Sequence, residues 1–261
     1  KGFLGLMSRF SDQARFRVNK KTNSIENGNV FNPFENRVAD SALISTNAFI
    51  RNALFFNRTS SIFAAGYTFQ QNQSKTLLAS GFDSRTNRYN ELNLRWNITR
   101  KFAVVLIGQQ GVKQVLADYT SGRDYSIDYQ WLKSTLSYQP STNFRLTLES
   151  RGVTKENVLS DGEGETCQII DVGSTFKYNQ TDKGSFQGEF KVLKIEYVGN
   201  VNSAIGFEML EALRPGINYT WTIGYQKTVS KNLQITFQYL GRKSEDTRII
   251  HTGGMEIRAF F

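Results

Sequence analysis

Cysteine, proline and histidine are scarce in this sequence. Its 261 residues contain one cysteine (Cys167), one histidine (His251) and three prolines. A single cysteine excludes an internal disulfide and a zinc site built from several cysteines. Nucleophilic catalysis needs an activating base with an orienting partner, and no such set surrounds His251. We therefore predict that the chain is not an enzyme and holds no cofactor or metal ion.

Long hydrophobic runs are also missing. No segment approaches the roughly 18 apolar residues that mark a membrane-spanning helix, and hydrophobic residues make up 39% of the chain. The first six residues are too short for a signal peptide, so we expect a mature or truncated start. The net charge of +9 comes from Lys and Arg residues that are dispersed along the chain. Without a basic stripe, nucleic acid is not an expected partner.

Aromatic residues, in contrast, are abundant, with 20 Phe, 11 Tyr and 3 Trp. Such chains suit long strands, because proline would remove a hydrogen-bond donor from the sheet. From about residue 42 onward apolar and polar residues alternate, most clearly in residues 92–98, 144–149, 217–226 and 233–239. This period of two predicts strands with two unlike faces.

Two segments fit the alternation less well. Residues 102–112 begin with apolar residues on both faces, and residues 186–197 slip between Val192 and Leu193. A β-bulge would explain the slip. Irregularities of this kind also occur in the core of a soluble β-sandwich, which remains the main structural alternative.

The connections alternate in length along the chain. Short turns are expected near residues 58–60, 99–101, 140–142, 181–184 and 230–231, and longer polar links at 19–41, 74–88, 115–125, 157–165, 199–213 and 243–249. Short turns at one end and long loops at the other are typical of bacterial transmembrane barrels. We predict an all-β fold, a transmembrane antiparallel up-and-down β-barrel of about 12 strands (range about 10–14). Residues 1–261 would form one domain, with residues 1–18 as its first strand or as a helix in the lumen.

The last segment carries the most specific pattern. Met255, Ile257, Ala259 and Phe261 alternate with Gly254, Glu256, Arg258 and Phe260, and the chain ends on phenylalanine. This resembles the terminal strand of bacterial outer-membrane β-barrel proteins. The resemblance implies a place in the cell outer membrane, the lipid bilayer as surroundings, and recognition of these four residues by the barrel-assembly machinery. The chain also looks like the C-terminal translocator domain of autotransporters, which would make it the last domain of a longer protein.

Projecting the polar residues of each strand inward predicts the lining of the lumen. The charged residues placed there are Arg95, Lys133, Arg145, Glu149, Lys177, Glu189, Lys191, Arg242, Glu256 and Arg258. An open pore with this basic lining would pass small polar solutes with some anion preference. Charge pairs across the lumen would instead close it and leave a membrane anchor or a component of an outer-membrane complex, with other outer-membrane or periplasmic proteins as partners. A protein-export barrel and a soluble β-sandwich binding protein are the alternatives.

Overall fold

The computed structural model contains one sheet of twelve strands, in which each strand pairs with its neighbours in sequence. It describes residues 7–23, 43–118, 121–159, 164–180, 183–230, 232–245 and 247–259. The strands are β1 (Phe10–Thr22), β2 (Leu43–Phe56), β3 (Phe63–Leu78), β4 (Gly81–Asn97), β5 (Phe102–Ala117), β6 (Tyr125–Tyr138), β7 (Phe144–Asn157), β8 (Thr166–Gln180), β9 (Gly184–Val198), β10 (Gly216–Ser230), β11 (Leu233–Ser244) and β12 (Ile250–Ala259). Two short helices, η1 (Ser121–Arg123) and α2 (Ala204–Met209), lie in connections.

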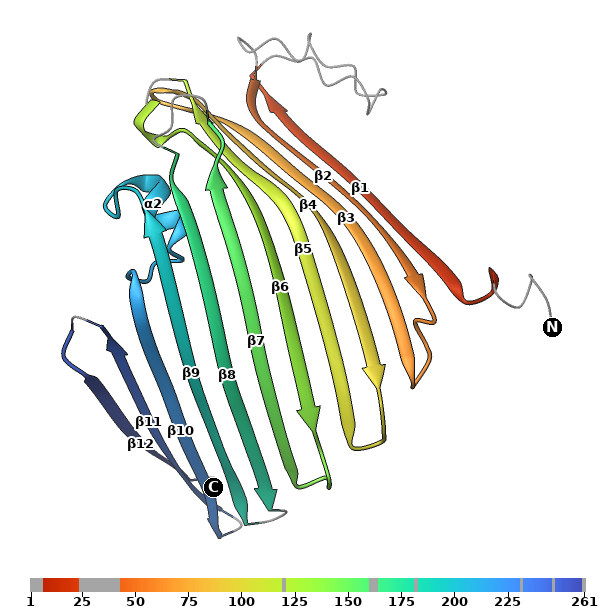
Figure 1. Ribbon diagram of the computed structural model, residues 1–261, viewed down its shortest axis with the longest axis vertical. Helices are drawn as coiled ribbons and strands as arrows, with labels where there is room; N and C mark the ends of the chain where they lie inside the picture. Colours follow the sequence, from red (N-terminus) through yellow and green to blue (C-terminus); the bar gives the residue numbers. More distant parts are fainter. Residues whose placement is uncertain are drawn as a thin grey trace.

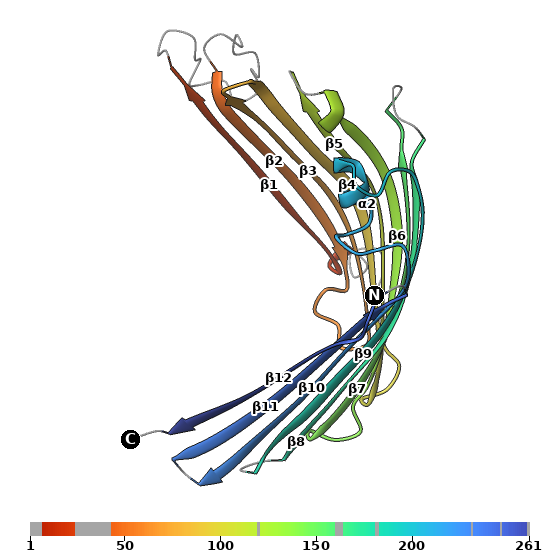
Figure 2. The same cartoon turned by 90° about the vertical axis from the view of Figure 1, so that its left-hand side faces the viewer.

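All eleven strand pairings are antiparallel, so the chain runs up and down across the sheet. The predicted all-β class, strand number and strand direction are confirmed. Because all described strands belong to one sheet, the β-sandwich alternative, which needs two packed sheets, is wrong for this part of the chain. The sheet curves strongly, and its two edge strands, β1 and β12, stand apart (Figures 1 and 2).

The pairing register defines the two faces of the sheet. Residues directly opposite each other in neighbouring strands point to the same side. Arg95 pairs with Val105, Val105 with Thr135, and Thr135 with Glu149, so these four residues share one face. Helix α2 lies on the concave side of the curved sheet (Figure 2). The concave face is therefore the one whose side chains meet α2, and the convex face carries the alternate residues.

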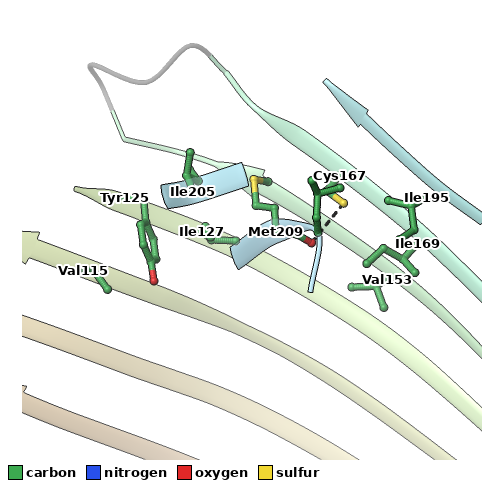
Figure 3. Packing of buried hydrophobic residues seen from close by; sticks show 10 residues of the cluster. Val115, Tyr125, Ile127, Val153, Cys167, Ile169, Ile195, Ile205 and Met209 are labelled. Carbon is green, nitrogen blue, oxygen red and sulfur yellow. Dashed lines mark hydrogen bonds between the residues drawn. The ribbon is translucent and has the colours of Figure 1, made fainter. Parts of the chain in front are cut away.

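Apolar side chains of the concave face form a small core with the connection between β9 and β10. Ile127, Cys167, Ile169 and Ile195 are almost fully buried, and so is Met209 at the end of α2. Val115, Tyr125 and Val153 of the sheet and Ile205 and Leu210 of the connection complete the cluster (Figure 3). The cluster covers β5 to β9 near the ends of the strands away from the short turns.

The residue pattern predicted a long loop at 74–88, and this prediction is wrong. β3 continues to Leu78 and β4 begins at Gly81, so only a tight turn separates them. Residues 83–88 of β4 carry polar side chains on both faces of the strand, for example Arg85 on the concave face and Arg88 on the convex face. Apolar–polar alternation cannot detect a strand with two polar faces.

The predicted bulge in 186–197 is also wrong. β9 pairs without a register shift with both β8 and β10. The apolar residues change sides along a regular strand: Phe190 and Val192 lie on the convex face, whereas Leu193 and Ile195 lie on the concave face beside the core. The apparent slip marks the level at which the concave face becomes the buried one.

The first described strand, β1, runs from Phe10 to Thr22, so it overlaps the predicted residues 1–18 but extends beyond them. Residues 1–6, part of the alternative luminal helix, lie outside the described residues. None of the helices in the described ranges has the length and apolar character needed to cross a bilayer.

Candidate functional site

The convex face carries an apolar zone next to the short turns. On β7 from Phe144 to Gly152, and on β8 from Ile170 to Tyr178, no convex-face residue is charged. Each stretch covers about nine residues, the length that a tilted transmembrane strand needs. Large apolar side chains in this zone are exposed, with 60% of Leu132 and 58% of Ile170 accessible. In water such a surface would be unfavourable over so wide an area.

Aromatic rings border this zone at the short-turn end. Phe102 and Tyr138 lie with ring centroids 4.6 Å apart, and Phe176 and Phe186 lie 5.2 Å apart. Phe10 and Phe56 form a similar contact at 5.1 Å between the first two strands. Each ring pair joins neighbouring strands beside a turn. Such a band of aromatic residues is typical of the level of lipid headgroups.

A polar row borders the zone at its other end. The row crosses five strands through directly paired residues, which are Asn90, Gln110, Gln130, Thr154 and Gln168. The hydroxyl of Tyr67 donates a hydrogen bond of 2.8 Å to Asn90 Oδ1. Beyond the row the convex face becomes charged, with Arg88, Asp128 and Glu156. The face therefore changes from apolar to polar at one level across β4 to β8.

The concave face holds all ten charged residues that the sequence assigned to a lumen. By register, seven cations and three carboxylates share this face. Lys133 Nζ lies 2.9 Å from Glu149 Oε2, between β6 and β7. Arg258 Nε lies 2.8 Å from Glu256 Oε1 within β12. These two ion pairs join neighbours along the wall. That the ten residues line a water-filled pore stays a prediction.

The terminal strand places Met255, Ile257 and Ala259 together on the convex face, all exposed. Phe261 lies outside the described residues, and the assembly signal stays a prediction. His251 lies on the same face, where its Nδ1 is 2.7 Å from the hydroxyl of Tyr239.

A cluster of charges that the sequence did not reveal lies where the β9–β10 connection meets the concave face. We call residues 203–213 the α2 segment, and Lys113, Arg151 and Lys155 the wall cations. Lys113 Nζ pairs with Glu208 of the segment. Arg151 Nη2 and Lys155 Nζ lie 2.9 Å and 3.0 Å from the carboxylate oxygens of Glu211. Lys155 also donates to the carbonyl oxygen of Met209 at 2.9 Å.

Burial and charge act on the protonation of Glu211 in this cluster. Burial acts to raise the pKa of Glu211, but hydrogen bonds and charge from Arg151 and Lys155 outweigh it, and the pKa lies below the ordinary value of 4.5. The Cys167 thiol donates a hydrogen bond of 3.4 Å to Met209 O. Glu211 is therefore charged at neutral pH, and Cys167 lies buried beneath the α2 segment.

No group of three or more His, Cys, Asp or Glu residues is placed to hold a metal ion in the part of the chain that the structure describes. A cavity of about 240 Å³ lies beside the α2 segment on the concave face. Its lining includes the wall cations, Glu208 and Glu211, and the aromatic residues Tyr129 and Trp131.

Comparison with known proteins gives similar solved structures, two of which are described below, and no family. No family model and no curated protein matches the chain. The β domain of the Bordetella autotransporter Brka is similar with 9% sequence identity and a TM-score of 0.39, over 97% of this chain and 100% of that one. The toluene transporter TbuX of Ralstonia pickettii is similar with 10% identity and a TM-score of 0.35, over 97% and 78% of the two chains. Both are so distant that neither assigns a ligand or a role to this chain.

Proposed function

We propose that this chain is a β-barrel of the bacterial outer membrane and acts as a passive pore for small polar solutes. The observation that carries the proposal is the contrast between the two faces. The convex face has an apolar zone about nine residues long, with aromatic rings at one border and amides at the other. The concave face carries charged residues at the same levels.

Lipid chains of a bilayer would cover the exposed apolar zone, whereas its contact with water is unfavourable. A sheet can lie in lipid only if all its backbone groups are hydrogen-bonded, so β1 and β12 must find partners. Pairing with each other would close the barrel, because β1 and β12 run in opposite directions and form the two free edges. The concave face would then become the lumen, with the ten charged residues along its wall.

Seven cations against three carboxylates among these ten residues favour anions in the pore. The α2 segment lies on the same face and would narrow the lumen on the side of the long loops. Small solutes would pass beside it.

The test is to refold the chain into lipid bilayers and record single-channel currents. We expect discrete ohmic steps with higher permeability for chloride than for potassium. Migration on a gel before and after heating reports independently whether a barrel has formed. A folded barrel that passes no current would contradict the pore and favour a membrane anchor or a partner-gated export barrel. Failure to insert would contradict the membrane assignment itself.

A further inference from the structure

The wall cations carry a surplus of positive charge that the α2 segment neutralises. Lys113, Arg151 and Lys155 extend from β5 and β7 on the concave face. Among the residues that the structure describes, the wall itself offers one direct carboxylate partner, Asp171, whose Oδ2 lies 2.7 Å from Arg151 Nε. Three cations and one carboxylate leave two positive charges. Glu208 and Glu211, both from the segment, supply the two negative charges that balance them.

The contact with Glu211 has the geometry of carboxylate recognition. Arg151 Nη1 and Nη2 donate to the two oxygens of Glu211 at 3.3 Å and 2.9 Å. A guanidinium fork that meets both oxygens in this way selects planar anions by shape as well as charge. Lys155 Nζ adds a third donor at 3.0 Å. The wall thus already holds a carboxylate, which happens to belong to the same chain.

The backbone at this contact is strained. Glu211 and Ala212 have φ angles of +54° and +61°, in the left-handed region that residues with a Cβ rarely adopt. Strain of this kind persists where surrounding contacts hold it in place. The ion pairs of Glu211 hold the turn together with backbone hydrogen bonds from Ala212 N to Phe207 O at 3.3 Å and from Leu213 N to Leu210 O at 3.0 Å. Losing the ion pairs would remove part of this hold.

The cavity of about 240 Å³ provides room for a solute next to the same cations. Tyr129 and Trp131 line it and are only partly buried, so they present aromatic surface to a bound molecule. Aromatic rings bind flat apolar groups well. The cavity therefore combines cations with a surface suited to the body of an organic anion.

We propose that the wall cations form a binding site for small organic carboxylates, and that Glu208 and Glu211 occupy this site as internal competitors. A carboxylate in the pore would take the place of Glu211 on Arg151 and Lys155, and the α2 segment would loosen from the wall. This binding site rests on the proposed pore function. It adds the class of solute that the pore would carry, small organic carboxylates, and the two side chains that compete with them, Glu208 and Glu211.

The test uses the whole chain refolded in detergent micelles, with benzoate as the probe and heat-dependent gel migration as the check on folding. Titration calorimetry measures binding. Removing the competitor in Glu211→Gln should tighten benzoate binding about tenfold, because the apparent affinity no longer includes displacement of Glu211. Lys155→Gln should weaken binding at least about tenfold, which corresponds to about 1.4 kcal/mol. Lys194→Gln, which removes a convex-face cation paired with Glu196 at 2.6 Å, should leave binding unchanged.

The natural cysteine gives a second readout that does not depend on any variant. Cys167 pairs with Lys155 across β7 and β8, and its thiol contacts Met209 of the segment. In the unmodified chain, benzoate should accelerate labelling of Cys167 by a maleimide, whereas neutral benzyl alcohol should not. Equal effects of benzyl alcohol, or equal losses of binding in Lys194→Gln and Lys155→Gln, would overturn the proposal.

The two proposals fail in different ways. If the folded barrel binds benzoate but conducts no current, the carboxylate site is supported and the pore is contradicted. If the barrel conducts but benzoate neither binds nor affects Cys167, the pore is supported and the carboxylate site is contradicted.

Discussion

At the scale of single residues, two convex-face glycines differ in whether a neighbouring side chain packs against them. A Cβ added at Gly188 would lie 2.3 Å from a ring carbon of Phe176, its direct partner on β8. Gly152, on the same face two strands away, has open space around it. The glycine at 188 thus allows an aromatic ring to lie across the strand, and the glycine at 152 does not serve that purpose.

Replacing Gly188 with alanine should destabilise the folded chain. The ring of Phe176 must move and would lose its contact with Phe186, at a cost of about 1–3 kcal/mol that is typical of overpacking. Urea unfolding of the refolded barrel measures the free energy of unfolding. Gly152→Ala is the matched control and should be close to neutral. Equal effects of the two substitutions would show that the ring contact does not matter.

In the strained turn of the α2 segment, a substitution should stabilise the structure instead of destabilising it. Ala212 has a φ of +61°, and glycine would remove that strain while adding freedom to the loosened state. The net stabilisation of the attached segment should be about 0.5–1 kcal/mol. Maleimide labelling of Cys167 should therefore slow about two- to fivefold in Ala212→Gly.

The control for this prediction is Ala204→Gly. Ala204 lies in the first turn of α2 and has no left-handed backbone. Glycine there should weaken the helix and accelerate labelling. Faster labelling in Ala212→Gly as well would contradict the idea that strain is stored at residue 212.

At the scale of elements, the strands were predictable where one face was apolar. The alternation in residues 144–149, 217–226 and 233–239 lies within β7, β10 and β11. It failed near the start of β4 because both faces of residues 83–88 are polar, and at Val192–Leu193 because the buried face changes sides. At β9 the change occurs because the β9–β10 connection, with α2, supplies an apolar partner to the concave face. A six-residue helix in a polar connection has too few residues for a helical period to be seen.

For the charged residues of the concave face, the sequence likewise predicts those that lie on strands but not their partners in a connection. The ten residues assigned to the lumen follow from parity alone, and the register puts them on one face. Arg151 and Lys155 have the same parity on β7 as Arg145 and Glu149, so that signal was available for them. Their partners Glu208 and Glu211 come from a connection, and no pattern in the sequence indicates where a connection folds back.

The α2 segment should respond to acid. Glu211 has a lowered pKa in the folded state, so its ion pairs stabilise the segment fully above pH 4.5 and are lost as the pH falls through the folded pKa. The groups that face it are Arg151 and Lys155 of β7, with Asp171 of β8 on the far side of Arg151. Amide hydrogen exchange of residues 203–213 should therefore rise below pH 4.5, after correction for the intrinsic pH dependence of exchange.

Glu211→Gln provides the comparison for the acid response. It cannot gain a proton at this position, so the segment should exchange faster at neutral pH and lose the step in acid. An acid step of equal size in the variant would assign the response to another carboxylate, such as Glu208 or Asp171.

At the scale of the whole molecule, the two edges of the sheet decide what the protein can do. Among the described residues, β1 and β12 each pair with a single strand, and their side chains are largely exposed. Exposed edges of this length readily pair with other strands. In a bilayer the pairing is obligatory, and joining the two edges of the same chain satisfies both at once.

Cross-linking tests this closure directly. In a background with Cys167→Ser, cysteine replaces Ala14 on the convex face of β1 together with one of Gly253, Met255 or Ile257 on the convex face of β12. Paired strands bring such positions within the roughly 4.4–6.8 Å between Cα atoms that a disulfide spans. We expect one of the three pairs to oxidise within a single chain after refolding into vesicles, giving a monomer whose gel migration changes on reduction. Cross-linked dimers would mean that the edges pair between copies, and a chain that inserts without forming any of the three disulfides would place the closing register elsewhere or leave the sheet open.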